Sequence, residues 1–388
     1  MKSINSILNQ IIEQGIDSIT DDSRSLQPGG VFIAIKGESH HGLDFMEQVQ
    51  KRKPAMVLSD KAFEKSSDLD FPLFHIPQLK QQLIKIYQSI YQIDLAQLQL
   101  IAVTGTNGKT SVAHLISQAL HAGYVGTLGM GSLDKLEITQ NTTPRLQILL
   151  PLFKSYLLQN VHQWVLEMSS HALMQQRLQG MTFKTAVFMN LSHDHLDYHQ
   201  TMQAYAEAKY KLFLEYQLQN AVICIDDKWG RQLLARLPSQ ISALSFASQQ
   251  MQEADIYPLS LSLTESGING CLQTPVGKLE FSSKLIGHFN VSNIMAVVGC
   301  LLFESWHLAD IQQVVTNFRG IDGRMEIIRQ QPTFIVDYAH TPDALEKALT
   351  TLRPICSGRL WCIVGCGGDR DPSKRSVMGA VAEKIADQ

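Results

Sequence analysis

The stretch "LQLIAVTGTNGKTSVAHLISQAL" constrains the fold of this chain more than any other part of its sequence. The apolar run at residues 98–103 predicts a strand, "GTNGKT" predicts a turn, and the residues that follow predict a helix. A glycine-rich turn in this position directs backbone N–H groups at phosphate oxygens. In such a P-loop Lys109 would hold the β- and γ-phosphates and the Thr110 hydroxyl would bind Mg²⁺. Val103 replaces the first glycine of the full motif, so a plain glycine turn is the alternative.

Strands and helices alternate around this turn from about residue 98 to residue 330. This order is typical of an α/β fold with a doubly wound, mostly parallel sheet. "HQWVLE" predicts a strand that ends at Glu167, and "TAVFMN" predicts a strand that ends just before His193. Because ligands bind at the carboxyl ends of such strands, we expect the P-loop, Glu167 and the loop after His193 to meet at one edge.

That loop, "NLSHDHLDYHQ", is rich in potential metal ligands: His193, Asp194, His195, Asp197 and His199. A carboxylate and an imidazole near a bound triphosphate suit Mg²⁺ that is held partly by the substrate. The spacing H-x-H-x-D by itself also suits a zinc hydrolase of the metallo-β-lactamase type. In hydrolases of that type the next histidine directly follows the aspartate, whereas Tyr198 separates Asp197 from His199 here. Such hydrolases also do not carry a P-loop. We therefore favour magnesium.

The segment "TMQAYAEAKYKLF" predicts a helix, because alanine, glutamate and lysine dominate it. From this pattern alone, Lys209 and Lys211 are both expected to be solvated lysines on the helix surface.

The composition favours a folded protein without affinity for nucleic acid or for anionic membranes. A chain of 388 residues suits two or three domains, and 45% hydrophobic against 18% charged residues suits well-packed cores. A net charge of -3 with scattered basic residues predicts binding neither to nucleic acid nor to an anionic membrane. We expect neither a signal peptide nor a membrane span. Six cysteines without a C-x-x-C pair indicate reduced, buried thiols in a cytoplasmic protein.

The chain divides into three blocks. Residues 1–97 mix short strands, such as "GVFIAIKG" and "PAMVLSD", with helical segments, and residues 98–330 form the α/β block. Residues 331–388 predict a strand in "PTFIVDYAH", a helix in "PDALEKALTTL" and a second strand in "LWCIVGCGG". Two strands make a poor independent domain, so we expect the last domain to be incomplete in this sequence.

Motifs extend over nearly the whole chain: "DDSRSLQPGGVFIAIKGESHHG", "TGTNGKTS", "NTTP", "LEMSSHAL", "NLSHDHLDYH", "AEAKYKLF", "GHFNVSNIMAV", "GIDGRMEII", "DYAHTPDAL" and "GCGGDRDPSKR". In this order they resemble the Mur ligase family, and within it the ligases that add a diamino acid to UDP-N-acetylmuramoyl-L-alanyl-D-glutamate. The resemblance implies a three-domain α/β architecture. Residues 1–97 would bind the uridine nucleotide, residues 98–330 would form a central ATPase domain, and residues 331–388 would belong to a Rossmann-like domain for the amino acid.

The resemblance also implies two Mg²⁺ sites and a carbamylated lysine, which matches Lys209. An ammonium would repel Mg²⁺, whereas a carbamate formed from CO₂ on that long side chain offers two anionic oxygens. By the same resemblance the metal ligands are Thr110, Glu167, His195 and the Lys209 carbamate. The catalytic residues are Lys109, Glu167, His195 and Lys209. His193 and His199 are then polar loop residues or lie behind the ligands.

The resemblance further implies sets of contact residues. ATP would be bound by Gly105, Thr106, Asn107, Gly108, Lys109, Thr110, Ser111, Asn293, Arg324 and Asp337. The uridine nucleotide would be contacted by Asp21, Ser23, Glu38, Ser39 and His40. The muramoyl dipeptide would be contacted by Asn141, Thr142, Thr143, Ser169, Gln175 and Arg177. The incoming amino acid would be contacted by Arg370. For each of these alone, the alternative is a surface polar residue or a helix cap.

The expected reaction uses ATP to join meso-diaminopimelate, or L-lysine, to the D-Glu γ-carboxylate through an acyl phosphate, in peptidoglycan precursor synthesis. "GCGGDRD" favours diaminopimelate, and we expect a monomer. Two alternatives stay open: a folylpolyglutamate-type synthetase, which "DDSR" and "NTTP" disfavour, and a nucleotide-binding module without chemistry.

Three features depart from the family pattern. The connection before "YVGTLGMG" is short, and Arg145 stands in "NTTPR" where an acidic or neutral residue is usual. The chain also stops before the family's D-N-P-R motif, which selects the diamino acid.

Overall fold

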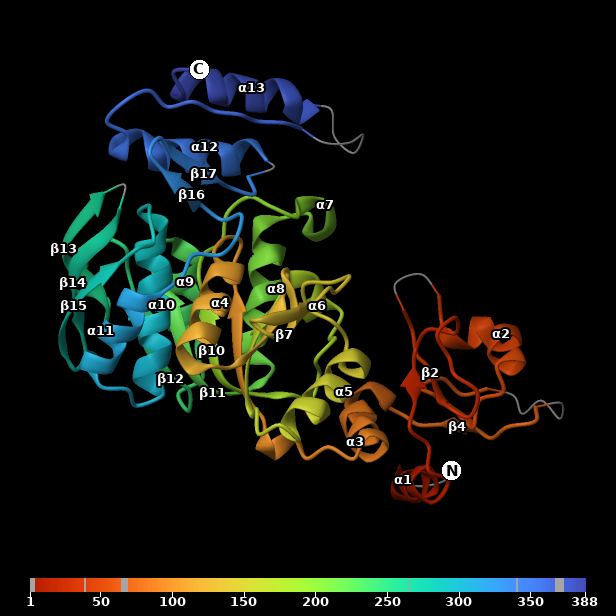
Figure 1. Cartoon of the computed structure of the whole chain (residues 1–388). Coiled ribbons are helices and arrows are strands. Elements are labelled where there is room, and N and C mark those ends of the chain that lie inside the picture. The colour runs from red at the N-terminus through yellow and green to blue at the C-terminus, as the bar shows by residue number, and fades with distance from the viewer. Residues whose placement is uncertain (1–3, 38–39, 64–68, 265, 340, 367–372) are drawn as a thin grey trace.

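The computed structural model describes the chain apart from residues 1–3, 38–39, 64–68, 265, 340 and 367–372 (Figure 1). The described strands form four sheets, one in the N-terminal part, two in the middle and one near the C-terminus. None of the described helices has both the length and the apolar character needed to cross a bilayer. All six cysteines are free thiols, as predicted, but only Cys224 and Cys300 are buried, and the other four are partly exposed.

The N-terminal part contains a small parallel sheet in the order β1-β2-β3-β4. Its strands are β1 (Ile19–Thr20), β2 (Val31–Ala34), β3 (Met56–Ser59) and β4 (Leu73–His75). Its helices are α1 (Ile4–Glu13), the 3-10 turn η1 (Gly42–Phe45) and α2 (Met46–Lys51). Every residue of β2 and β3 is buried, which confirms the two strands predicted from apolar runs.

The middle of the chain is built on an eight-stranded sheet in the order β12-β11-β10-β5-β9-β6-β7-β8. Helix α3 (Leu79–Tyr91) and the turn η2 (Leu95–Gln97) lead into it. Its strands are β5 (Gln99–Thr104), β6 (Gly123–Gly126), β7 (Gly129–Ser132), β8 (Lys135–Glu137), β9 (Gln163–Glu167), β10 (Thr182–Phe188), β11 (Gln217–Cys224) and β12 (Ser242–Phe246). All neighbours from β12 to β6 are parallel, and only the pairs β6–β7 and β7–β8 are antiparallel, which confirms a mostly parallel sheet.

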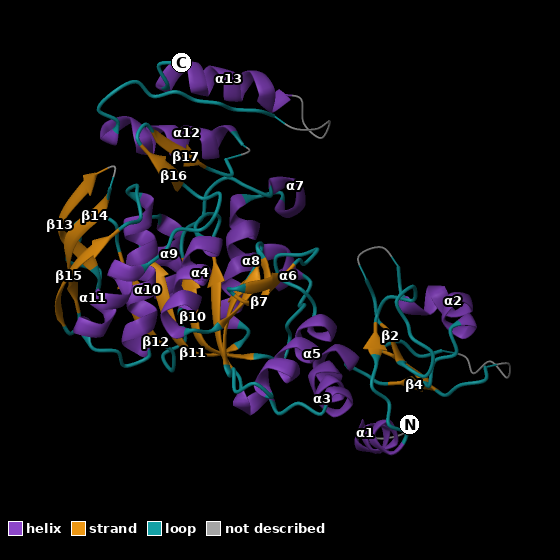
Figure 2. Cartoon of the chain, viewed as in Figure 1, coloured by secondary structure: helices purple, strands orange, loops and turns teal. Residues whose placement is uncertain are grey.

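Helices cover both faces of this sheet (Figure 2). The helices of the middle part are α4 (Lys109–Leu120), α5 (Leu146–Leu157), α6 (Ser170–Met174), α7 (Leu196–His199), α8 (Met202–Leu214), α9 (Lys228–Arg236), α10 (Phe289–Phe303) and α11 (Leu308–Asn317). Alternate residues of a strand point to opposite faces. Accordingly Ile101 and Val103 share a core with α4 and α10, whereas Leu100 and Ala102 share a core with α5 and α8.

A three-stranded antiparallel meander follows the parallel sheet and was not predicted. It consists of β13 (Tyr257–Thr264), β14 (Gly267–Thr274) and β15 (Gly277–Ser283), and α11 packs against β15. Gly267 and Gly277 have φ of +144° and +134°, a region that favours glycine. These glycines allow the tight turns that join the three strands, in a region where an alternation of strands and helices was expected.

The C-terminal part contains the antiparallel pair β16 (Glu326–Gln330) and β17 (Thr333–Val336), then α12 (Pro342–Leu352), the turn η3 (Arg353–Ile355) and α13 (Ser373–Ile385). The predicted strand in "PTFIVDYAH" and the helix after it are confirmed. The strand predicted in "LWCIVGCGG" is wrong, because residues 360–366 join no described sheet. A strand needs a neighbour, and this segment bonds instead to the end of the chain, through Leu360 and Cys362 to Asp387 and Gln388.

Candidate active site

The turn between β5 and α4 has the geometry of a phosphate-binding loop. Gly105 and Gly108 both have positive φ, and a Cβ at Gly105 would lie 2.9 Å from the Cβ of Met189. Lys109 begins α4, and its Nζ donates to the carbonyl oxygens of Gly105 and Thr106 at 2.9 and 2.8 Å. Burial lowers the pKa of Lys109, and the nearby Arg324 guanidinium adds to this effect. The lysine is thus folded onto its own loop.

Hydrogen bonds join the rest of the loop to the segment that follows β10. The Thr106 hydroxyl accepts from the Ser192 N–H at 3.0 Å, and the Asn107 N–H donates to Asn190 Oδ1 at 2.9 Å. Thr110 and Ser111 lie in the first turn of α4. The predicted convergence of the P-loop with the histidine loop is thus formed by direct hydrogen bonds.

Glu167, the last residue of β9, is fully buried behind the P-loop. Its Oε1 accepts from the Tyr124 hydroxyl at 2.5 Å and the Thr127 N–H at 2.9 Å. Its Oε2 accepts from the hydroxyls of Thr110 at 3.0 Å and Thr127 at 3.3 Å. Burial, followed by the negative charge of Glu167, raises the pKa of Tyr124, so the phenol stays protonated. Four hydrogen bonds therefore satisfy both oxygens of this buried carboxylate.

Lys209 of α8 is 1% exposed, so the expectation of a solvated lysine is wrong for this residue. Its Nζ donates to the Gly105 carbonyl at 2.8 Å and lies 4.7 Å from the centroid of the Tyr205 ring. Burial, and then the positive charge of Lys109, hold the pKa of Lys209 well below its usual value. Lys211, by contrast, is partly exposed and pairs with Glu215 at 2.7 Å. The helix packs one lysine inward and leaves the other at the surface.

The three histidines of "NLSHDHLDYHQ" differ in exposure. The His195 side chain is 46% exposed, and its ring centroid lies 6.0 Å from that of Tyr205. His199 is buried, stacks on Tyr205 and bonds through Nε2 to Ser170 Oγ at 2.9 Å, whereas His193 is exposed. In the described part of the chain, no three His, Cys, Asp or Glu side chains are grouped so that they could hold a metal ion.

The four implied metal ligands therefore form two groups that flank the P-loop. Thr110 and Glu167 are hydrogen-bonded to each other, whereas His195 and Lys209 both lie against Tyr205. The Tyr205 hydroxyl in turn lies 3.3 Å from Thr106 Oγ1, within hydrogen-bond distance.

The residues implied for the muramoyl dipeptide form a connected network next to Glu167. The Thr143 hydroxyl donates to the Glu167 carbonyl at 2.7 Å and accepts from the Ser169 N–H at 3.1 Å. Arg177 donates to the Thr143 carbonyl and to Gln175 Oε1, both at 2.8 Å. Of the remaining two, the Thr142 hydroxyl lies 3.2 Å from that of Thr127, and Asn141 is exposed in the preceding turn.

The residues implied for the uridine nucleotide lie in the N-terminal part. Ser23 Oγ donates to Gln48 Oε1 at 2.9 Å, and the His40 ring packs edge-on against Phe45. The Asp21 carboxylate forms an ion pair with Arg145, the residue that departs from the family pattern. Glu38 and Ser39, together with Arg370 for the amino acid, lie outside the described residues.

Of the three remaining ATP residues, Asn293 lies beside the loop, and Arg324 and Asp337 lie in the connection to the C-terminal part. Asn293 of α10 is buried beside Gly108 and donates to Asn290 Oδ1 at 2.7 Å. Arg324 lies over the Tyr338 ring, with its Cζ 4.8 Å from the centroid. Asp337 accepts from the N–H groups of Met325 and Ala339, both at 2.9 Å, so it orders the connection to the C-terminal part.

Three contributors to the site were missed from the sequence: Tyr124, Thr127 and Tyr205. Tyr124 and Thr127 lie at the carboxyl end of β6, so the rule about strand ends could have found them. Tyr205 stands four residues before Lys209, a spacing that places two side chains on the same face of a helix.

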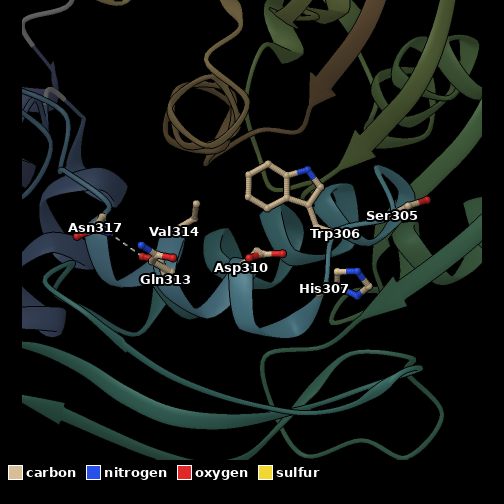
Figure 3. A pocket seen from close by; sticks show the side chains of 7 residues that line it. All are labelled: Ser305, Trp306, His307, Asp310, Gln313, Val314 and Asn317. Carbon is tan, nitrogen blue, oxygen red and sulfur yellow. Dashed lines mark hydrogen bonds between the residues drawn. The ribbon is translucent and has the colours of Figure 1, made fainter.

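A pocket of about 500 Å³ lies elsewhere, at the turn between α10 and α11 (Figure 3). It is lined by Trp306, His307, Asp310, Val314 and neighbours. Helix α10 begins beside the P-loop and ends before this pocket, so the pocket lies at the far end of the helix and contacts none of the groups above.

The P-loop lysine, the buried carboxylate at the end of the adjacent strand and the parallel sheet define an ATP-binding α/β protein of the P-loop type. Known proteins make this assignment specific. The family profile "Mur ligase middle domain" matches residues 103–301, and "Mur ligase, glutamate ligase domain" matches residues 323–388. The chain belongs to the Mur ligase family.

Two relatives and one solved structure share a name. The chain is 39% identical over 384 residues to the UDP-N-acetylmuramoyl-L-alanyl-D-glutamate--2,6-diaminopimelate ligase of Chromobacterium violaceum, covering 96% of this chain and 77% of the relative. It is 40% identical over 397 residues to the protein of that name from Pseudomonas aeruginosa, covering 98% and 80%. A solved structure of a ligase with that name aligns with a TM-score of 0.80 at 34% identity, covering 96% and 77%.

Proposed function

We propose that this chain is an ATP-dependent, amide-forming ligase that adds diaminopimelate to UDP-N-acetylmuramoyl-L-alanyl-D-glutamate during peptidoglycan precursor synthesis. The names of the two relatives and of the solved structure described above state this activity. One observation carries the proposal furthest. Glu167 accepts from the P-loop Thr110 through its carboxylate and from Thr143 of "NTTP" through its carbonyl. One residue therefore separates the phosphate site from the site proposed for the muramoyl dipeptide.

The reaction needs an activated carboxylate, because a carboxylate anion repels an attacking amine and oxide is a poor leaving group. The D-Glu γ-carboxylate attacks the γ-phosphate of ATP, which yields an acyl phosphate and ADP. The amine of diaminopimelate then attacks the acyl carbon, and the tetrahedral intermediate expels phosphate. Catalysis of the first step is mainly positioning and charge neutralisation, to which Lys109 contributes when it exchanges loop carbonyls for phosphate oxygens.

The residues around the P-loop fit magnesium. The Thr110 hydroxyl and the buried Glu167 carboxylate are oxygen donors, which Mg²⁺ prefers, and they lie where a triphosphate would end. We propose that His195 and Lys209, as a carbamate, complete the set. Lys209 suits this modification because its lowered pKa leaves a larger neutral fraction, and only the neutral amine attacks CO₂. When bound, Mg²⁺ would neutralise charge on the transferred phosphoryl group.

Phosphate release tests the reaction and its substrates together. The protein is supplied with ATP and either UDP-N-acetylmuramoyl-L-alanyl-D-glutamate or a folate, each with diaminopimelate, L-lysine or L-glutamate. We expect release only with the muramoyl dipeptide, and fastest with diaminopimelate. Release with folate and glutamate would instead support a folylpolyglutamate-type synthetase. ATP binding without release in every mixture would leave a nucleotide-binding module.

A further inference from the structure

The two carboxylate oxygens of Glu167 are held by donors of different kinds. Oε1 accepts from the backbone N–H of Thr127 and from the hydroxyl of Tyr124. Oε2 accepts only from the hydroxyls of Thr110 and Thr127 among the described residues. A threonine hydroxyl rotates freely and can turn its lone pairs toward a cation, whereas a backbone N–H cannot.

The Tyr124 donor is as fixed as the backbone one. The Tyr124 side chain is among the largest fully buried ones, and its ring packs edge-on against His114 with the centroids 6.3 Å apart. The Tyr124 oxygen also accepts from the Leu128 N–H at 3.5 Å. The ring cannot swing away without disturbing the core between β6 and α4, so its hydroxyl stays directed at Oε1.

Gly126 shows how closely this turn approaches the carboxylate. A Cβ built on Gly126 would overlap both Glu167 Oε1 and the Tyr124 hydroxyl. Gly126 does not need positive φ, so close approach is what demands a glycine here. The segment Tyr124–Thr127 therefore forms a rigid cradle on one side of Glu167 and leaves the other side adjustable.

We infer that Tyr124 is a positioning residue that anchors Oε1 of Glu167, so that Oε2 is the single oxygen Glu167 offers to the magnesium ion beside Thr110. The inference rests on the proposed function, which assigns Glu167 to metal binding. It goes further by stating which carboxylate oxygen binds the ion and which side chain decides this. Partners that orient a metal ligand in this way typically change metal affinity about 10–100-fold when they are removed.

The test compares Tyr124→Phe, which keeps the ring and removes the hydroxyl, with Tyr216→Phe. Tyr216 is a matched control, because its buried hydroxyl has no partner among the described residues and it precedes β11 outside the site. The probe is Mn²⁺ with a non-hydrolysable ATP analogue, and electron paramagnetic resonance measures the free ion. We expect Tyr124→Phe to weaken Mn²⁺ binding about tenfold or more and Tyr216→Phe to leave it unchanged.

Two further measurements separate this role from a general loss of structure. In phosphate release, Tyr124→Phe should raise the half-saturating Mg²⁺ concentration while the KM for the muramoyl dipeptide stays unchanged. Circular dichroism of both tyrosine variants checks that each is folded. Gly126→Ala would displace the Glu167 carboxylate itself as well as the phenol, so its loss of Mn²⁺ binding sets the size of the effect expected when Glu167 is misplaced.

The outcomes separate the two ideas. If the unmodified protein takes up no Mn²⁺ with the ATP analogue, both the metal assignment in the proposed function and this inference fall. If it binds Mn²⁺ and the Tyr124→Phe protein binds equally well, the proposed function stands and the role of Tyr124 is refuted.

Discussion

Lys109 and Lys209 both donate to the carbonyl of Gly105, although they lie in different helices. Two ammonium groups on one acceptor repel each other, and burial removes the water that would screen them. The repulsion falls when one amine is neutral, and Lys209 is the one whose pKa burial and the charge of Lys109 hold well below its usual value. Bound phosphate would draw Lys109 away from this carbonyl, and carbamylation would turn Lys209 from a competitor into an anion.

Lys109→Ala should abolish ADP formation, because no other described side chain of the P-loop brings a positive charge to the phosphates. Binding of the muramoyl dipeptide should persist, since its proposed contacts lie on the far side of Glu167. ADP release and calorimetric titration with the dipeptide substrate measure the two properties separately. Full turnover by the variant would refute the P-loop assignment.

Lys209→Ala should also abolish turnover, but through the loss of the carbamate. A short carboxylic acid that fills the space left by the side chain should restore part of the activity. Lys211→Ala is the matched control on the same helix, because Lys211 makes only a partly exposed ion pair with Glu215 and should matter little. Equal activities of the two variants, with no response to added acid, would leave Lys209 without a catalytic role.

The contrast between these two lysines shows what a sequence pattern resolves at the scale of residues. Lys109 was predicted because its position in a glycine turn has only one common use. Lys209 and Lys211 are equivalent in an alanine-rich helix, and only packing against the P-loop distinguishes them. Tyr124 was not predicted, because a tyrosine in an apolar strand has the pattern of an ordinary core residue. Only the structure shows that its hydroxyl donates to Glu167.

At the scale of elements, Asp227 connects two parts of the site. Its Oδ1 caps α9 by accepting from the N–H groups of Trp229 and Gly230 at 2.8 and 2.9 Å. Its Oδ2 accepts from the Leu191 N–H at 2.9 Å, near the start of the histidine loop. The start of one helix and the loop after β10 therefore depend on a single side chain.

Asp227→Ala should lower the free energy of unfolding by about 1–2 kcal/mol, because it removes a helix cap and leaves a loop N–H without its acceptor. Urea unfolding followed by circular dichroism measures this. Asp227→Asn keeps one acceptor oxygen for the cap and should lose less than Asp227→Ala. If the two variants lose the same stability, the cap contributes nothing.

Elements with strong local signals were predictable, and those that depend on distant partners were not. The apolar runs of β5 and β9 and the amphipathic pattern of α12 agree with the structure. The antiparallel meander β13–β15 forms its own three-stranded sheet with α11 packed against β15, a pairing that the sequence of each strand alone does not show. Residues 360–366 are mostly apolar, which predicted a strand, but β17 pairs with β16 and these residues join no described sheet.

At the scale of the whole molecule, α3 joins the N-terminal part to the part built on the central sheet. Helix α3 packs on α1 and on α5, and Tyr91 donates to the Gln147 carbonyl at 3.3 Å. The ion pair between Asp21 and Arg145 lies in the same region. It joins the segment proposed for the uridine nucleotide to the residue that follows "NTTP", so it spans the two halves of the proposed substrate site.

Arg145→Gln should therefore weaken use of the nucleotide substrate without affecting ATP. A partly exposed ion pair contributes up to about 1 kcal/mol, which corresponds to a rise of about fivefold in the KM for the muramoyl dipeptide at an unchanged KM for ATP. The other Asp21 oxygen is buried and has no hydrogen-bond partner among the described residues, so Arg145 is the cation that the described residues provide for this carboxylate. For this reason Asp21→Asn should add little once Arg145 is gone, and a double-mutant cycle on this KM should show the coupling. Strictly additive effects would mean that the two side chains act separately and that the parts are held together by α3 alone.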